Sequence, residues 1–294
     1  MPKMQEEEKC IPNHATYFCA IKACSVMAML EHGKVIHAQV IENGFELDLS
    51  VANTLIDMYS KCSSMDGASQ LYRQKMELNV VMCNNALIDM YAKCGSLDKA
   101  TLVFNQMVQK DVVTWNTLIT GYAHHGNAKQ AYMLFKKMKE EKMEPNHITY
   151  VSLLKACANI SDLEQGKQIH ASIIECDFET IDYVGNTLVC MYAKCGNLVD
   201  AQVMFNRLLK QDIVTWNIII SAYVQYGYWI QALEDFHKMG MYDIEPDRIT
   251  YLAVLSACSS IGSLQWGREI HSHIINQGVI SDLFLGSSLI DMYA

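Results

Sequence analysis

The feature that most constrains this chain is an internal repeat with a fixed offset. The motif Thr-Trp-Asn at residues 114–116 returns 101 positions later at 215–217. Gly-Lys-Gln-Ile-His at 166–170 returns, with the same offset, as Gly-Arg-Glu-Ile-His at 267–271. A period kept without slippage over so much sequence is typical of an array of stacked repeats, each of which packs only against its neighbours.

Each repeat is predicted to form two helices joined by a tight turn. Trp115, Leu118, Ile119 and Tyr122 follow the spacing i, i+3, i+4, i+7, which places them on one face of a helix. Gly126 then interrupts the pattern and suits a helix end, and a second helical pattern follows. Because alternating strand patterns are absent, we expect an all-α protein, a right-handed superhelical solenoid of helix-turn-helix repeats.

Repeats of 35, 35 and 31 residues account for the 101-residue period. The expected boundaries start with the tail of a partial repeat and end in a truncated one. The ranges are 1–13, 14–48, 49–80, 81–111, 112–146, 147–181, 182–212, 213–247, 248–282 and 283–294.

Composition favours a folded protein without a membrane span. Apolar residues make up 51% of the chain, charged residues 19%, and there are four prolines. No stretch approaches the 18 or so apolar residues of a spanning helix. The first 13 residues are acidic at positions 6–8 and lack the features of a targeting peptide.

The cysteines and histidines recur in phase with the repeats. Cysteines that share a repeat position lie one or more repeats apart, and no Cys-x-x-Cys occurs, so we expect neither a metal nor a cofactor. Buried, reduced thiols are the better interpretation. In-phase histidines are likewise expected to be packing or surface residues. One cysteine position is occupied by Cys62, Cys94 and Cys195, and the other by Cys24, Cys157 and Cys258. The histidine position is occupied by His37, His170 and His271.

Catalytic motifs are missing from the sequence. There is no His-x-Glu of a zinc deaminase, no phosphate-binding loop and no nucleophile elbow. We therefore expect that this chain is not itself an enzyme.

These motifs resemble those of plant pentatricopeptide repeat proteins of the PLS class, in which P, L and S repeats alternate. The resemblance covers the chain beyond residue 13 and includes NALIDMYAKCGSLDKA and KACANISDLEQGKQIHA. It also implies a fragment that lacks the carboxyl-terminal extension and DYW-type deaminase domain of the class. P-like repeats are 112–146 and 213–247; L-like repeats are 14–48, 147–181 and 248–282; S-like repeats are 49–80, 81–111 and 182–212.

The resemblance implies binding of single-stranded RNA, with one base read by each repeat. In the family, the readers are the fifth residue of the first helix and the last residue of the repeat. The corresponding pairs are Asn53 with Asn79, Asn85 with Asp111, Asn116 with Asn146, Asn186 with Asp212, and Asn217 with Asp247. By the same resemblance, the preferred RNA is pyrimidine-rich, approximately N-Y-U-Y-N-U-U-N.

Physical chemistry supports these positions and also offers a simpler explanation of some of them. An Asn amide carries a donor and an acceptor, as a pyrimidine edge requires. Asn116 lies one helical step off the apolar stripe, so we expect it to point away from that core face. However, an Asp before a helix is also an ordinary capping residue, and capping alone could explain the aspartates. The L-like repeats have Phe18, Val151 and Leu252 at the fifth position, which cannot bond a base edge.

Two further sets of residues are candidates for RNA contacts. Val113 and Val214, at the family's second position, would stack on base faces, or they would be ordinary core residues. Lys61, Lys93 and Lys194 would contact phosphates, or they would be solvated lysines that are favourable at helix ends. The net charge of −9 and pI of about 5.5 argue against a globally basic surface.

The function expected from the resemblance is site recognition in organellar RNA processing, including cytidine-to-uridine editing. Editing cofactors or a deaminase would then act in trans, in a mitochondrion or chloroplast. The alternative is a helical scaffold that binds a protein without reading RNA. The in-phase Asn and Asp pairs favour the first function.

Overall fold

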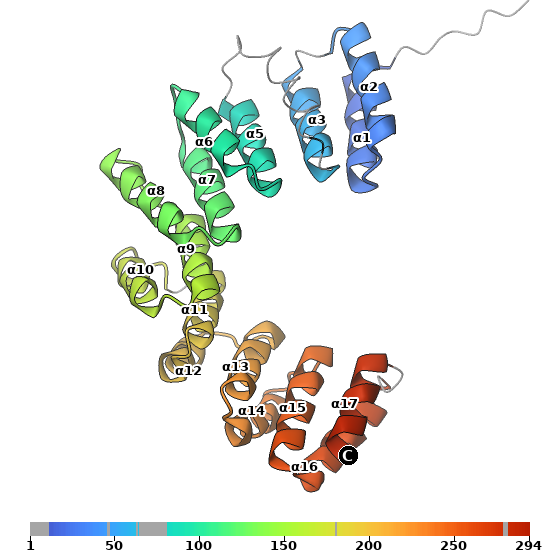
Figure 1. The fold of residues 1–294 in the computed structure, drawn as a ribbon, viewed down its shortest axis with the longest axis vertical. Coiled ribbons are helices and arrows are strands. Elements are labelled where there is room, and N and C mark those ends of the chain that lie inside the picture. The colour runs from blue at the N-terminus through green and yellow to red at the C-terminus, as the bar shows by residue number, and fades with distance from the viewer. Residues whose placement is uncertain (1–11, 46–47, 63, 65–80, 180, 279–281) are drawn as a thin grey trace, which may run out of the picture. The chain divides into compact units, whose positions relative to one another are not determined.

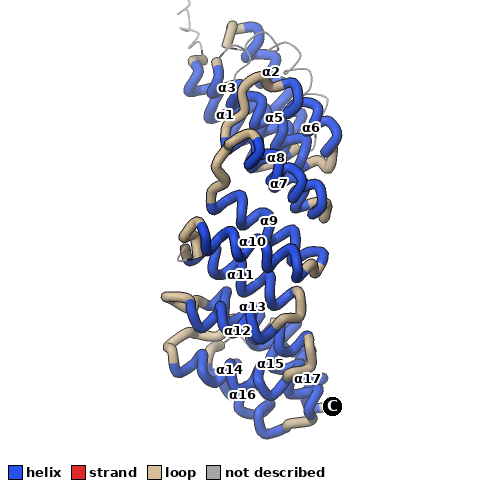
Figure 2. The backbone as a smooth tube through the Cα atoms, turned by 90° about the vertical axis from the view of Figure 1, so that its left-hand side faces the viewer, coloured by secondary structure: helices blue, strands red, loops and turns tan. Residues whose placement is uncertain are grey.

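A computed structural model describes residues 12–45, 48–62, 64, 81–179, 181–278 and 282–294. In these ranges every regular element is an α-helix, and helices follow one another in antiparallel hairpins (Figures 1 and 2). The predicted all-α solenoid of helical hairpins is therefore confirmed. No described helix has both the length and the apolar character needed to cross a bilayer.

The chain forms two compact bodies, Met1–Asn146 and His147–Ala294. The helices of the first body are α1 (His14–Val26), α2 (Leu30–Glu42), α3 (Leu49–Lys61), α5 (Val81–Lys93), α6 (Leu97–Gln106), α7 (Val112–His124) and α8 (Ala128–Glu140). Those of the second body are α9 (His147–Ile160), α10 (Leu163–Glu175), α11 (Asp182–Lys194), α12 (Leu198–Arg207), α13 (Ile213–Gln225), α14 (Trp229–Met241), α15 (Arg248–Ile261), α16 (Leu264–Asn276) and α17 (Leu283–Tyr293).

Within each body the first helices of successive repeats pack directly on one another. They are α1, α3, α5 and α7 in the first body, and α9, α11, α13, α15 and α17 in the second. Each second helix packs against the first helix of its own repeat and, in most repeats, against the first helix of the next. This arrangement gives each body a first-helix row and a second-helix row.

A side-chain cap determines where several first helices begin. The Asp111 carboxylate accepts a hydrogen bond from the backbone N–H of Thr114 at 2.8 Å, and the Thr114 hydroxyl accepts one from the N–H of Asp111. Asp212 and Asp247 form the same reciprocal box. Such a box satisfies donors that the first helical turn leaves without partners, and it commonly stabilises a helix by about 1 kcal/mol. Each described first helix accordingly begins at the first residue of its repeat.

Tight turns end the first helices. Gly126 and Gly196 have φ values of 74° and 76°, a left-handed conformation that residues with a Cβ rarely adopt. The next residue then donates back across the turn, as Asn127 does to the Tyr122 carbonyl at 2.9 Å. The chain thereby reverses direction in about three residues, and the two helices of a hairpin pack side by side.

Aromatic pairs join consecutive repeats in the core. Trp115 of α7 meets Phe104 of α6 edge to face, with ring centroids 4.7 Å apart. Trp216 meets Phe205 at the same distance in the second body. Since Trp115 and Ile119 are both fully buried, the predicted apolar stripe is the core face of the helix.

The in-phase cysteines and histidines have structural roles. Cys157 and Cys258 are buried, and burial raises the pKa of these thiols to about 12 and 11, which keeps them protonated and unreactive. The in-phase histidines join an L-like repeat to the next repeat, as predicted for packing residues. Their Nδ1 atoms hydrogen-bond tyrosine hydroxyls in the pairs His37–Tyr59 (2.8 Å), His170–Tyr192 (2.8 Å) and His271–Tyr293 (3.0 Å).

Candidate nucleic-acid interface

The candidate reading asparagines lie on the first-helix rows and contact the last residues of their own repeats. Asn217 Nδ2 donates to both carboxylate oxygens of Asp247, at 3.1 Å each. Asn116 Nδ2 donates to Asn146 Oδ1 at 3.0 Å. The contacts are longer in the S-like repeats: 3.4 Å for Asn85–Asp111 and 3.5 Å for Asn186–Asp212. Four pairs are thus brought together by folding, whereas Asn79, the predicted partner of Asn53, lies outside the described residues.

These side chains are less accessible than the helical pattern predicted. Asn116 and Asn217 are only 6% and 8% exposed, so folding covers both side chains. The position of Asn116 off the apolar stripe of its helix does not by itself expose the side chain to solvent. Asn85 and Asn186 are partly exposed.

The last residue of a repeat both caps a helix and contacts the reading asparagine. Asp111 Oδ1 accepts from the Thr114 backbone at 2.8 Å and from Asn85 Nδ2 at 3.4 Å. Burial raises the pKa of Asp111, but hydrogen bonds from Thr114 and Asn85 outweigh it and leave the pKa below the ordinary 3.8. The carboxylate is therefore ionised at neutral pH. The capping interpretation and the reading interpretation are compatible in this geometry.

Apolar side chains at the second position of the repeats point to solvent. Val113 and Val214 are 59% and 56% exposed, so the alternative that they are ordinary core residues was wrong. Four other exposed side chains, which were not predicted as contact residues, occupy the same repeat position. They are Ile148, Tyr183, Ile249 and Phe284. Their shared position, one step after the start of each first helix, was the available signal.

Cations lie against the two aromatic members of this set. Lys155 Nζ is 5.2 Å from the centre of the Tyr183 ring and donates to its hydroxyl at 2.7 Å. The Arg248 guanidinium lies 4.4 Å from the centre of the Phe284 ring. Aromatic faces beside positive charges are favourable surroundings for nucleobases next to phosphates.

The three predicted phosphate lysines differ in their partners. Lys61 and Lys93 form ion pairs with Asp57 and Asp89, at 2.8 and 2.6 Å, one helical turn earlier. In α11 the equivalent acidic position holds Cys190, and Lys194 makes no ion pair with any described residue. The three lysines are therefore not equivalent, and Lys194 is the one whose charge is not neutralised by a nearby carboxylate.

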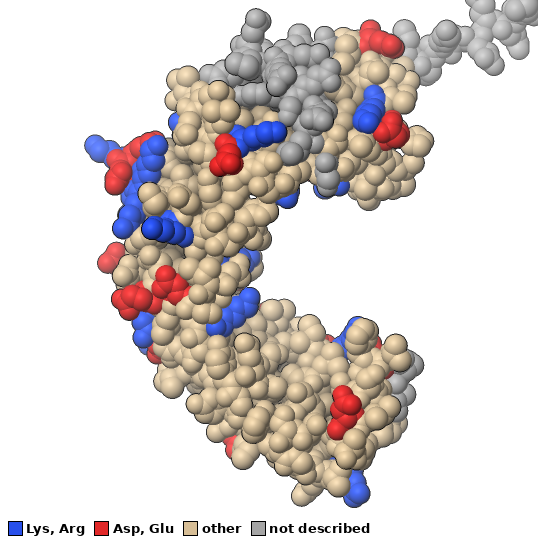
Figure 3. All heavy atoms as spheres, viewed as in Figure 1, with Lys and Arg blue, Asp and Glu red and all other residues tan. Residues whose placement is uncertain are grey.

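Elsewhere, basic side chains gather away from the first-helix row. On the face shown in Figure 3, Lys and Arg side chains cluster over α8, with acidic side chains among them. This helix carries Lys137 and Lys139 in its last turn and belongs to the second-helix row. The cluster is therefore separate from the candidate interface.

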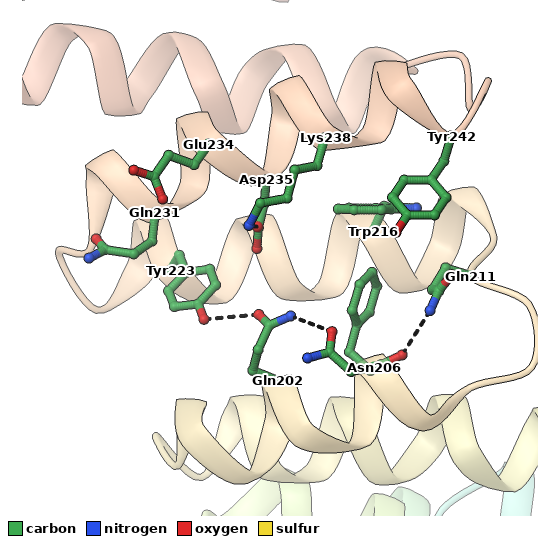
Figure 4. A pocket seen from close by; sticks show the side chains of 11 residues that line it. Gln202, Asn206, Gln211, Trp216, Tyr223, Gln231, Glu234, Asp235, Lys238 and Tyr242 are labelled. Atoms are coloured by element: carbon green, nitrogen blue, oxygen red, sulfur yellow. Dashed lines mark hydrogen bonds and ion pairs between the residues drawn. The ribbon is translucent and has the colours of Figure 1, made fainter.

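A cavity of about 270 Å³ lies on the second-helix side, between α12, α13 and α14 (Figure 4). Asp235, which is 4% exposed, lines it; its Oδ1 accepts from Lys238 at 2.8 Å, and its Oδ2 has no partner among the described residues. Leu134 occupies the equivalent position of the other P-like repeat. None of the candidate reading residues lines this cavity.

Comparison with sequence families places repeats along most of the described chain. The profile of the PPR repeat family matches residues 110–159 and 211–260. The PPR repeat profile matches residues 50–80, 85–112 and 186–213.

Similar proteins with longer chains occur in Arabidopsis thaliana. The mitochondrial pentatricopeptide repeat-containing protein At3g09040 is 35% identical over 280 residues, which are 95% of this chain and 24% of that protein. The chloroplastic protein At1g11290 is 30% identical over 294 residues, 100% of this chain and 32% of that protein. This chain therefore spans about a quarter to a third of these relatives. Their names place them in mitochondria or chloroplasts, in agreement with the predicted localisation.

Solved structures share the fold. The crystal structure of the pentatricopeptide repeat protein PPR10 in complex with an 18-nt psaJ RNA element superposes with a TM-score of 0.70 at 20% identity. The match covers 88% of this chain and 39% of that one. The crystal structure of PPR10 from maize gives a TM-score of 0.61 at 21% identity over 96% of this chain and 47% of that one.

Proposed function

This chain belongs to the pentatricopeptide repeat family, and from that premise we propose that it binds single-stranded RNA along its first-helix rows. Each P-like or S-like repeat reads one base with its fifth residue and its last residue. PPR10, which shares the fold, has been crystallised with an 18-nt RNA. The L-like repeats space the bases instead, since Val151 and Leu252 offer no hydrogen bond to a base edge.

One observation carries the proposal: in four repeats, the Asn at the fifth position contacts the last residue of its own repeat. An ordinary helix cap requires the Asp but not the Asn 26 or 30 residues before it. The recurrence leaves amide groups at regular intervals beside exposed second-position side chains such as Val214 and Tyr183. Amides for the base edge and apolar groups for the base face are the combination that recognition of unpaired bases uses.

The preferred RNA is pyrimidine-rich, approximately N-Y-U-Y-N-U-U-N from 5′ to 3′ for repeats 14–48 to 248–282. Filter binding with this RNA and with its purine-substituted counterpart tests the proposal directly. Selective retention of the first RNA is expected. Equal retention of both RNAs, or of neither, would count against base reading and would favour the protein-binding scaffold.

A single substitution tests the assignment of the readers. Asn217→Thr is expected to move the preference of repeat 213–247 from uracil towards guanine, because a hydroxyl replaces the amide beside Asp247. The measurement is in-vitro selection of bound RNAs by the wild type and the variant. Selected pools that do not differ at this position would contradict the assignment, and Asn84→Thr, which changes the residue beside a reading Asn, serves as the control.

We further propose that the chain supplies site recognition for organellar RNA processing, including cytidine-to-uridine editing, and not the catalysis. The alternating P-like, L-like and S-like repeats support membership of the PLS class. Editing cofactors or a deaminase would act on the RNA that the repeats hold. Loss of editing at one organellar site on removal of the gene, restored by the wild type but not by Asn217→Thr, is the expected result.

A further inference from the structure

The carboxamide of Asn217 is held at both ends, and one of these contacts comes from the next repeat. Its Nδ2 donates to both oxygens of Asp247, at 3.1 Å each. Its Oδ1 accepts a buried hydrogen bond from the Thr250 hydroxyl at 2.6 Å. Thr250 is fully buried and is the third residue of repeat 248–282. A residue outside the proposed reading pair therefore contacts the group that would read the base.

The S-like repeats lack this second contact. Asn186 Nδ2 lies 3.5 Å from Asp212, and its Oδ1 is buried without a hydrogen-bond partner in the described part of the chain. Thr215 occupies the position equivalent to Thr250, and both hydroxyls contact the aspartate that they help to cap, Thr215 at 2.8 Å and Thr250 at 3.1 Å, but only Thr250 also bonds the reading Asn. Asn85 has the same unpartnered Oδ1. Identical residues at equivalent positions thus hold the Asn217 amide at both ends and the Asn186 amide at one end only.

The orientation of an amide determines which pyrimidine it matches. A half-turn of the carboxamide exchanges its N–H donor and its carbonyl acceptor. At ring position 4, cytosine presents an amino donor and uracil presents a carbonyl acceptor. An amide fixed in one orientation separates the two bases, whereas an amide that can reverse accepts both. For Asn217, one oxygen lone pair remains for the base after the two contacts of Nδ2 with Asp247 and the contact of Oδ1 with Thr250 are counted.

We propose that Thr250 is a positioning residue for base selection. Its hydroxyl fixes the Asn217 carboxamide, so repeat 213–247 separates uracil from cytosine more sharply than repeat 182–212 does. The inference rests on the proposed RNA-binding function. It adds a specificity determinant at the third residue of the following repeat.

The test compares affinities for RNAs that differ only by U or C at the base read by Asn217. Thr250→Val is nearly isosteric and removes the hydroxyl, and we expect it to lower the U-to-C affinity ratio roughly two- to tenfold, the effect of one hydrogen bond. Thr250→Ser restores the hydroxyl and should restore the ratio. Thr215→Val removes the same kind of helix cap at the start of α13 without removing a hydrogen bond to Asn217, and it should leave the U-to-C ratio at the base read by Asn217 unchanged.

A measurement without RNA makes the hydrogen bond itself testable. In NMR spectra of the full chain, the Asn217 side-chain amide signals should shift in Thr250→Val and return in Thr250→Ser. An unchanged ratio in Thr250→Val, or an equal loss in Thr215→Val, would overturn the inference and leave the proposed function standing. Absence of any base preference in the wild type would instead overturn the proposed function, and the inference with it.

Discussion

Some single residues in this chain form hydrogen bonds with residues on both sides of a repeat boundary. Asp247 caps α15 through the Thr250 backbone at 3.0 Å and also holds Asn217. Asp212 does the same for α13 and Asn186. The geometry of a candidate reading pair therefore depends on the helix of the following repeat, and not only on the repeat to which the pair belongs.

Asp235 is a residue whose charge is unfavourable for folding. Burial raises its pKa above 3.8, although the hydrogen bond from Lys238 opposes the shift. A raised pKa in the folded state means that the stability contributed by this group is fully present below the unfolded pKa and is lost as pH rises through the folded pKa. At neutral pH the fold therefore contains a disfavoured carboxylate, which the apolar Leu134 avoids in the related repeat.

Asp235→Leu is expected to stabilise the protein at pH 7 by about 1 kcal/mol, because well-packed apolar residues often replace buried ion pairs without loss. The gain should shrink as the pH is lowered from 7 to 4, because burial raises the pKa of Asp235 and favours protonation of its carboxyl group. Chemical denaturation at both pH values measures the difference. Lys238→Met should have the opposite sign, since it leaves the buried carboxylate without its partner. A destabilised Asp235→Leu at pH 7 would disprove the assignment of an unfavourable charge.

At the scale of helices, close packing in the first-helix row depends on small residues. A Cβ placed on Gly121 of α7 would lie 2.6 Å from the Cβ of Ala92 in α5, closer than real side-chain atoms approach. Both residues belong to first helices that stack directly. By contrast, a Cβ on Gly240 near the end of α14 would meet no atom within 4 Å.

Gly121→Ala should therefore destabilise the chain by about 1–3 kcal/mol, the usual effect of overpacking a rigid contact. Gly240→Ala is the matched control and should stabilise it by up to about 1 kcal/mol, because alanine favours a helix over glycine. Thermal and chemical unfolding of the two variants provide the comparison. If both substitutions shifted stability in the same direction, the contact between α7 and α5 would not be as tight as described.

The helices were predictable because their signals are local. The stripe of Trp115, Leu118 and Ile119, the turn at Gly126 and the cap at Asp111 all lie within one repeat, so their spacing was sufficient. The Thr250 contact of Asn217 was not predictable in this way. It depends on how closely α13 approaches α15, and no spacing within a single repeat encodes that distance.

At the scale of the molecule, the chain clusters into two compact bodies, Met1–Asn146 and His147–Ala294, and the repeat period crosses the boundary between them unchanged. Each body has its own first-helix row. In the nearest-neighbour view of solenoids, the stability of each body is approximately a sum over the interfaces between its successive repeats.

Charge sets the expected salt dependence of RNA binding. The net charge is −9, and Lys61 and Lys93 already form ion pairs with carboxylates. With only a few phosphate contacts, the logarithm of the association constant should fall with the logarithm of the salt concentration with a slope of magnitude about 2. Filter binding from low to moderate salt measures it. A slope near ten would show that many more lysines reach the phosphates.

The shared aspartate also restricts how such a chain can acquire a new target. Exchange of the fifth residue alters a side chain that ends no helix, so mutation there is comparatively free. Where the final residue caps the next helix, as Asp212 and Asp247 do, its exchange is confined to the short list of side chains that can cap a helix, chiefly Asp, Asn, Ser and Thr. A change of RNA specificity by single substitutions should therefore occur mainly at the fifth residue. The final residue should vary only among the few residue types that cap a helix.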